Sequence, residues 1–335
     1  MVARLSVPWA NVEPMRTAHR SPTLPVTTLS ATFVALAYLA SFGPGVYVSI
    51  VVLLNDVASD AASSPVDELI SRVFLVGVGL ILGYGATQCL GRSWTREWLR
   101  GRRSSTPGSG ILSAGAALGA LMLGYWAIGP FVSPTYTHSR EADGSMAIAT
   151  VKAFIGAGVA EEFIVLALPV VLLRAAAPNA LRGRWLALTL GVLVCLRMAF
   201  HLYYGWWALT LLPWAVVASA AYLRWGRVWP LVFQHTAYNM ALAAIRADLV
   251  DREATLATLS LTAGFCVILG WLLISRHRTS RLRFMQHRES GFTAQFDSGT
   301  CTNCGDPIEA GQEIANSYGG QVPPYVSGLS ESTGL

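Results

Sequence analysis

Long apolar runs separated by short polar stretches set the class of fold for this chain. A bilayer core about 30 Å thick needs roughly 20 apolar residues per crossing helix. The chain is 53% hydrophobic and only 13% charged, whereas soluble domains carry about 25% charged residues. We therefore predict an all-α, polytopic integral membrane helix bundle of about eight transmembrane helices. The predicted spans are residues 28–54, 69–90, 111–133, 147–173, 185–206, 208–223, 230–246 and 255–275.

The basic residues indicate how these spans are oriented. Most of the 24 Lys and Arg residues fall in the N-terminal segment, in the loops after the second, fourth and sixth spans, and in the tail. Because cytoplasmic loops collect Lys and Arg, both termini are predicted to be cytoplasmic in a multi-pass protein of the plasma membrane. This orientation accounts for the net charge of +5. Membrane lipids are therefore expected partners, and nucleic acid is not.

The same pattern divides the chain into three parts. Residues 1–27 are predicted to be a cytoplasmic N-terminal segment, residues 28–276 the transmembrane bundle, and residues 277–335 a cytoplasmic, mostly disordered tail. No small-residue cleavage site accompanies the first run, so it is expected to be retained as a helix. Cys301-x-x-Cys304 in the tail has the shape of half a zinc knuckle. A closed zinc site needs four ligands. Cys301 and Cys304 are therefore expected to be a solvated pair of thiols.

Small residues predict where the spans come close together. The pairs Gly79/Gly83 and Gly115/Gly119 have the spacing that lets helix backbones approach each other. A kink is expected where Pro44 interrupts the first span.

Two glutamates and two histidines occur inside predicted spans. Glu161 and Glu162 lie in the fourth, His201 in the fifth and His235 in the seventh. A carboxylate at bilayer depth costs about 2.5–3.5 kcal/mol on insertion scales, so these groups are expected either to function or to pair. Successive residues of an α-helix are about 100° apart, so the two glutamates are predicted to face different neighbours.

The spacing around the two histidines adds further polar groups. Arg197 and His201 are four residues apart, as are His235 and Asn239, so each pair is predicted to share a helix face. A carboxylate or histidine can take a proton from water, and a histidine with an amide can stabilise an oxyanion. Glu161, His201 and His235 could alternatively bind a divalent metal such as zinc. Structural ion pairing and proton-coupled transport use the same residues, although no inverted repeat of the transporter kind is visible.

These three segments resemble the CPBP family of intramembrane proteases, also called the CAAX protease and bacteriocin-processing family. The family pattern is Glu-Glu-x-x-x-Arg, Phe-x-x-x-His and His-x-x-x-Asn/Asp on successive helices, and residues 145–246 carry the similar core. The resemblance implies an intramembrane endopeptidase in which Glu161 and His201 activate water, His235 and Asn239 bind the oxyanion, and Glu162 supports them. It implies a peptide or membrane-protein substrate, and a divalent metal such as zinc as a possible cofactor.

The chain departs from this family pattern at two positions. Leu166 stands where the first motif has arginine, and Arg197 stands where the second has phenylalanine. We hypothesise that Arg197 reaches across and pairs with Glu162, replacing the arginine of the first motif. On that hypothesis, an Arg197→Ala protein should lose stability or activity, and Leu166→Arg should partly restore it. A non-catalytic or immunity-type membrane protein is the alternative implied by the lost arginine.

Overall fold

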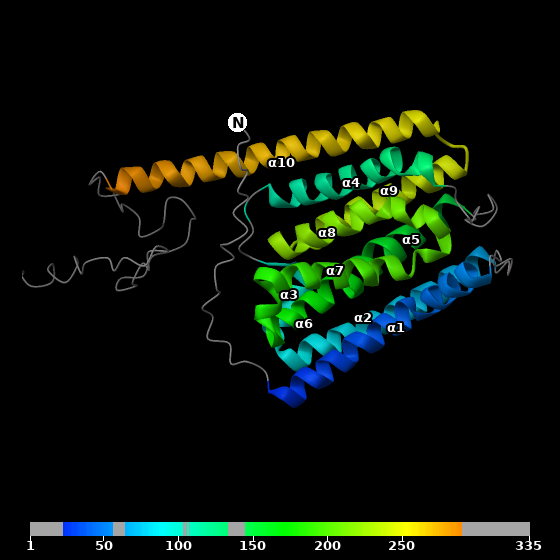
Figure 1. Cartoon of the computed structure of the whole chain (residues 1–335), viewed down its shortest axis with the longest axis horizontal. Coiled ribbons are helices and arrows are strands. Elements are labelled where there is room, and N and C mark those ends of the chain that lie inside the picture. The colour runs from blue at the N-terminus through cyan, green and yellow to red at the C-terminus, as the bar shows by residue number, and fades with distance from the viewer. Residues whose placement is uncertain (1–22, 56–63, 103–105, 107, 133–144, 290–335) are drawn as a thin grey trace, which may run out of the picture. The chain divides into compact units, whose positions relative to one another are not determined.

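The computed structural model describes residues 23–55, 64–102, 106, 108–132 and 145–289. Every regular element in these ranges is a helix (Figure 1), which confirms the all-α prediction. The chain divides into a unit that ends at Arg278 and a second unit that begins at Thr279. The elements are α1 (Leu24–Asn55), α2 (Pro65–Leu90), α3 (Arg92–Arg100), α4 (Ser109–Ala127), η1 (Gly129–Phe131), α5 (Met146–Lys152), η2 (Ala153–Ala167), α6 (Leu168–Ala176), η3 (Pro178–Leu181), α7 (Gly183–Ala199), η4 (Leu202–Leu211), α8 (Leu212–Trp225), α9 (Trp229–Arg246) and α10 (Arg252–Glu289).

Six helical segments of the described chain are long and apolar enough to cross a membrane, so the protein is a multi-pass membrane bundle. Each of the six matches a predicted span to within a few residues. They are Leu24–Val51, Val66–Leu90, Ser109–Phe131, Met146–Ala176, Leu202–Trp225 and Arg252–His277.

The predicted count of eight is not confirmed, because the runs 185–206 and 230–246 do not qualify. α7 has only 17 residues and ends at Ala199. α9 has 18 residues, but they include glutamine, histidine, asparagine and arginine, which lower its hydropathy. The two helices that carry the histidine motifs are therefore the least membrane-like of the predicted set. The predicted orientation stays a prediction.

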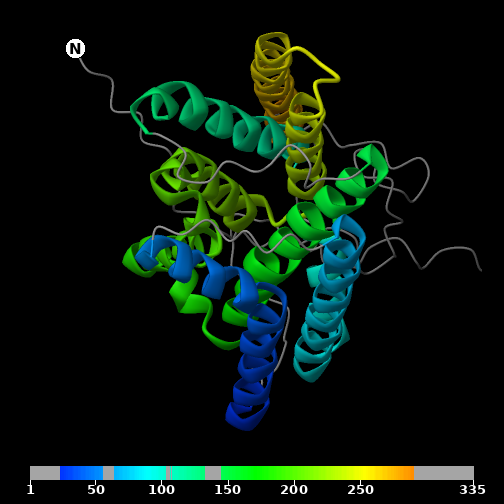
Figure 2. The ribbon, with the colours of Figure 1, turned by 90° about the vertical axis from the view of Figure 1, so that its right-hand side faces the viewer.

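Glycines set how closely the outer helices pack. α1 and α2 pack against each other, and α4 lies beside α10 at the opposite edge of the first unit (Figure 1). A Cβ at Gly79 would lie 2.0 Å from Ser41 Oγ, and one at Gly115 would lie 2.6 Å from the Cβ of Cys266. The predicted close contacts are therefore confirmed at these two glycines, whereas Gly119 has ordinary spacing. α1 contains Pro44 and bends, as Figure 2 shows.

η2 lies within the most buried of the candidate spans, Met146–Ala176, and it packs against α1 to α3 and α5 to α9. It is a π-helix of fifteen residues, whose i→i+5 hydrogen bonds widen each turn. Most π-helical structure consists of single turns near functional sites, so this length is unusual. Small residues allow close packing: a Cβ on Gly158 would lie 2.3 Å from Thr236 Oγ1 of α9.

The short helix α3 was not predicted, because its sequence was assigned to a basic loop. Its indole Trp98 is buried and donates a hydrogen bond to the Phe163 carbonyl of η2 at 3.0 Å. Glu97 of α3 also pairs with Arg174, and the Leu99 carbonyl accepts from Trp229 Nε1 at 2.9 Å. The arginines of α3 are exposed, so the helix is amphipathic. At the other end of the chain, α10 continues to Glu289, past the predicted boundary at 276. Cys301 and Cys304 lie outside the described residues.

Candidate active site

Arg197 and Glu162 form a fully buried ion pair between α7 and η2. Arg197 Nη1 donates to Glu162 Oε2 at 3.1 Å, and Nη2 donates to Oε1 at 2.5 Å. Neither residue has solvent exposure. The contact proposed from the sequence is therefore present, and it is bidentate, the strongest geometry between these two groups.

Both adjacent glutamates face His235, contrary to the prediction that they face different neighbours. His235 Nδ1 lies 3.2 Å from Glu162 Oε1 and 3.9 Å from Glu161 Oε2. The prediction assumed α-helical geometry, but η2 is a π-helix with more residues per turn, so successive side chains diverge by a smaller angle. The widened turn lets the two neighbouring carboxylates serve one site.

His201 reaches the site from beyond the end of a helix. The prediction placed Arg197 and His201 on one face of a helix that runs to residue 206, but α7 ends at Ala199. The chain then passes through Phe200 and His201 into the 3₁₀-helical η4. This break directs His201 toward η2, and its Nε2 lies 3.5 Å from Glu161 Oε2.

Glu161 and His201 have unused hydrogen-bonding capacity on the atoms that face each other. Glu161 Oε2 and both ring nitrogens of His201 are buried, and none has a hydrogen-bond partner among the described residues. An unsatisfied buried polar group costs about 1–3 kcal/mol. Glu161 is 6% and His201 9% exposed, whereas Glu162 is 0% exposed. Glu161 and His201 therefore offer polar atoms that could bind a water molecule or a substrate atom beside them.

Sequence reasoning missed Trp214, which lies at the centre of this group. Its ring faces the Arg197 guanidinium at 4.1 Å and contacts the His235 ring edge-on at 4.5 Å. His201 is 6.3 Å away on a third side. Tryptophans of membrane helices favour the interfaces, so a tryptophan in the middle of the predicted span 208–223 was the signal that could have found it.

Replacement of Trp214 by alanine is expected to destabilise the protein by about 3–5 kcal/mol, as for other buried tryptophans, and to reduce activity. Trp214→Phe keeps an aromatic face for Arg197 and should retain most of both. The measurement is thermal unfolding in detergent beside a peptide-cleavage assay. If Trp214→Phe lost as much stability and activity as Trp214→Ala, the aromatic face would contribute to neither.

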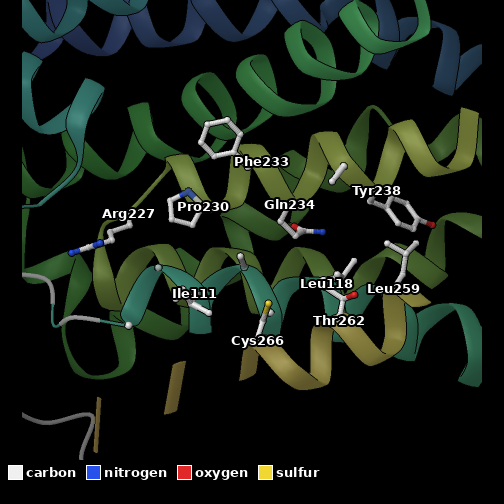
Figure 3. Close-up of a pocket in the computed structure, with 15 residues that line it drawn as sticks. Ile111, Leu118, Arg227, Pro230, Phe233, Gln234, Tyr238, Leu259, Thr262 and Cys266 are labelled. Carbon is white, nitrogen blue, oxygen red and sulfur yellow. The ribbon is translucent and has the colours of Figure 1, made fainter. Parts of the chain in front are cut away.

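A separate cavity of about 570 Å³ lies between α4, α9 and α10 and includes none of the predicted site residues (Figure 3). Apolar side chains such as Ile111, Leu118 and Phe233 line it, together with the buried amide of Gln234. Gln234 precedes His235 in the chain, so α9 turns one polar residue toward this cavity and the next toward the glutamates. The cavity and the site are therefore on different faces of α9.

The segment that carries these glutamates and histidines matches a known family. Residues 143–241 fit the family model described as type II CAAX prenyl endopeptidase Rce1-like. This segment of the chain is similar to the CAAX proteases. This match confirms the resemblance found in the sequence, and it supports a CAAX-type intramembrane protease with a peptide or protein substrate. Neither the curated proteins nor the solved structures contain a match to the chain.

Asn239 and Leu166 occupy the two remaining positions that were compared with the family motifs. Asn239 is half-buried, and its Nδ2 donates to the His235 carbonyl of its own helix at 3.0 Å. One amide hydrogen therefore remains for another acceptor. Leu166, which stands in place of the motif arginine, is completely buried in the apolar core. The arginine that contacts Glu162 comes instead from α7.

A zinc ion at this site would be held by Glu161, His201 and His235, because zinc binds through histidine nitrogens and carboxylate oxygens. In the described part of the chain, no cluster of three or more His, Cys, Asp or Glu residues is arranged to hold a metal ion. The His235 nitrogen nearest Glu161 is already within hydrogen-bond distance of Glu162. The reaction proposed below therefore uses no metal.

Proposed function

We propose that this protein is an intramembrane endopeptidase that hydrolyses a peptide bond with a water activated by Glu161 and His201. The observation that carries the proposal is the unsatisfied pair of polar groups. Glu161 Oε2 and His201 Nε2 face each other at 3.5 Å without other partners among the described residues. A water bound beside both groups could accept a hydrogen bond from His201 and donate one to Glu161.

The reaction requires a base, and Glu161 is the best-placed one. Glu161 takes a proton from the water, whose oxygen attacks the peptide carbonyl carbon. When the carbon–nitrogen bond breaks, Glu161 returns that proton to the leaving amine nitrogen, which leaves a carboxyl and an amine terminus. A positioned general base contributes about 10²–10⁴-fold to such a reaction.

His235 is proposed to stabilise the oxyanion of the intermediate, together with Asn239. A carboxylate only accepts hydrogen bonds, so His235 Nδ1 donates to Glu162, at 3.2 Å. Nε2 is then the atom left for the substrate, and it donates to an oxyanion when the ring carries its second proton. The free amide hydrogen of Asn239 would supply a second donor. Glu162 and Arg197 thus act as positioning residues that hold the His235 ring.

The substrate is proposed to be a peptide or a membrane-protein segment in the plasma membrane, with both termini of the protease in the cytoplasm. The direct experiment uses the purified protein in detergent and a set of fluorogenic peptides, with products identified by mass spectrometry. Cleavage by the wild type that disappears in His235→Ala supports the proposal. Absence of any cleavage product from wild-type protein would contradict it.

Chelation provides a separate test of the metal-free reaction. Because no step uses a metal, we expect peptide cleavage to be unchanged within about twofold after treatment with EDTA or 1,10-phenanthroline. Metal analysis of the purified protein would accompany the assay. Loss of activity on chelation, restored by zinc, would establish the alternative in which Glu161, His201 and His235 bind the metal.

A further inference from the structure

We propose that Arg72 forms a subsite for an anionic group of the substrate, about one helical turn from Glu161. This inference rests on the proposed peptidase function and adds a substrate class, an acidic peptide. Arg72 lies in the second turn of α2, and its side chain is 45% exposed. It lies outside both the CAAX-family match and the predicted set of site residues.

A glycine of η2 brings the Arg72 guanidinium close to the site. A Cβ built on Gly156 would lie 2.8 Å from Arg72 Nη1 and 3.0 Å from Arg72 Cδ. The guanidinium therefore lies directly on the backbone of η2. Gly156 is five residues before Glu161, which is one turn of i→i+5 hydrogen bonding.

The charges beside Arg72 leave a net positive site. Glu68 Oε1 accepts from Arg72 Nη2 at 3.3 Å, and Glu68 Oε2 accepts from Lys152 Nζ at 2.7 Å. One carboxylate is thus shared between two cations. The Arg72–Glu68 pair is exposed, and exposed ion pairs contribute only about 0–1 kcal/mol. Arg72 can therefore exchange this partner for a ligand carboxylate at little cost.

Two neighbouring tyrosines lie beside the histidine that is proposed to act with Glu161. The Tyr204 ring stacks on His201 with centroids 6.0 Å apart. The Tyr203 and Tyr204 rings contact each other, with centroids 4.1 Å apart. Phenol-bearing rings therefore line the His201 side of the site.

The negative charge of Glu161 explains why a cation is needed here. An anionic peptide approaching Glu161 is repelled, and the repulsion is stronger in a low-dielectric site than in water. Arg72 offsets this repulsion for an anionic group that is bound one helical turn from Glu161. One turn of roughly 5 Å equals about two residues of extended peptide. The expected anion is therefore an Asp or Glu side chain, or a free C-terminal carboxylate, about two residues from the cleaved bond.

The test compares matched peptides on full-length variants in detergent. Three peptides share one cleavable core: one has an Asp two residues from the cleaved bond, one ends there in a free carboxylate, and one is amidated and neutral. For the Arg72→Gln variant we expect KM for the two acidic peptides to rise about tenfold or more, with kcat nearly unchanged. KM for the neutral peptide should stay within twofold. Arg72→Lys should retain part of the preference, and Arg92→Gln, an exposed arginine at the start of α3, should retain all of it.

A binding measurement tests the subsite independently of catalysis. Fluorescence anisotropy with the same labelled peptides on Glu161→Gln protein, with and without Arg72→Gln, should show the same loss for the acidic peptides alone. Equal changes for acidic and neutral peptides, or no change for any, would overturn the subsite. Charge-selective binding without any cleavage by wild-type protein would overturn the proposed function and support the subsite.

Discussion

A Glu161→Gln protein is expected to cleave peptide about 10²–10⁴-fold more slowly than the wild type, because the amide cannot take a proton from water. The substitution keeps the shape of the side chain. It removes a buried charge that the structure leaves without a hydrogen bond on Oε2. We therefore expect the unfolding temperature in detergent to be unchanged or slightly higher, which separates a chemical role from a structural one.

The matched control for this variant is Glu253→Gln, at an exposed glutamate in the first turn of α10. It removes the same charge far from the site in sequence and should cleave at the wild-type rate. Cleavage by Glu161→Gln within tenfold of the wild type would remove Glu161 from the mechanism. Proton-coupled uptake into vesicles that depends on Glu161, without cleavage of any peptide, would instead assign the same residues to transport.

Loss of the buried arginine is expected to destabilise the protein strongly. Arg197→Ala leaves the Glu162 carboxylate without its charged partner at 0% exposure, and breaking a buried pair in this way costs about 3–5 kcal/mol. The variant also removes the cation that faces Trp214. Thermal unfolding in detergent, with cleavage measured on the folded fraction, checks both consequences.

A double variant provides the control for this prediction. Arg197→Met combined with Glu162→Leu leaves no unpaired charge, so it should be markedly more stable than Arg197→Ala. It should nevertheless cleave poorly, because His235 loses the acceptor of its Nδ1 hydrogen. A double variant as unstable as Arg197→Ala would show that packing, and not charge pairing, dominates.

The structure also bears on the proposed rescue by Leu166→Arg. Leu166 is fully buried in the apolar core, and overpacking a core typically costs 1–3 kcal/mol. We therefore now expect little recovery of the Arg197→Ala protein from this second change. Leu166→Arg in the Arg197→Ala protein tests whether an arginine at the position of the family motif can replace Arg197.

The sequence predicted the membrane-crossing helices well wherever the helix is apolar throughout. Length and hydropathy alone define α1, α2 and α4. The same criteria failed for α7 and α9, because a helix that supplies arginine, histidine or asparagine to a site is less apolar than one that faces lipid. They also missed α3, because its attachment depends on partners distant in sequence, namely the Phe163 carbonyl, Arg174 and Trp229.

The residues of the candidate site could be selected from the sequence, but their arrangement could not. Motif spacing singled out Glu161, Glu162, His201 and His235, and the exchanged arginine predicted the contact between Arg197 and Glu162. The joint orientation of the two glutamates depends on the hydrogen-bond register of η2, which packing against α2 and α9 selects. No local pattern of residues specifies that register.

The widened turns of η2 make the spacing of residues along it more critical than their bulk. Each turn is closed by a bond to the fifth residue along the chain. Losing or gaining one residue between Gly156 and Glu161 would shift the carboxylates around the axis relative to the glycines that touch α2 and α9. Insertions and deletions in this stretch should therefore be far less acceptable than exchanges of one side chain for another.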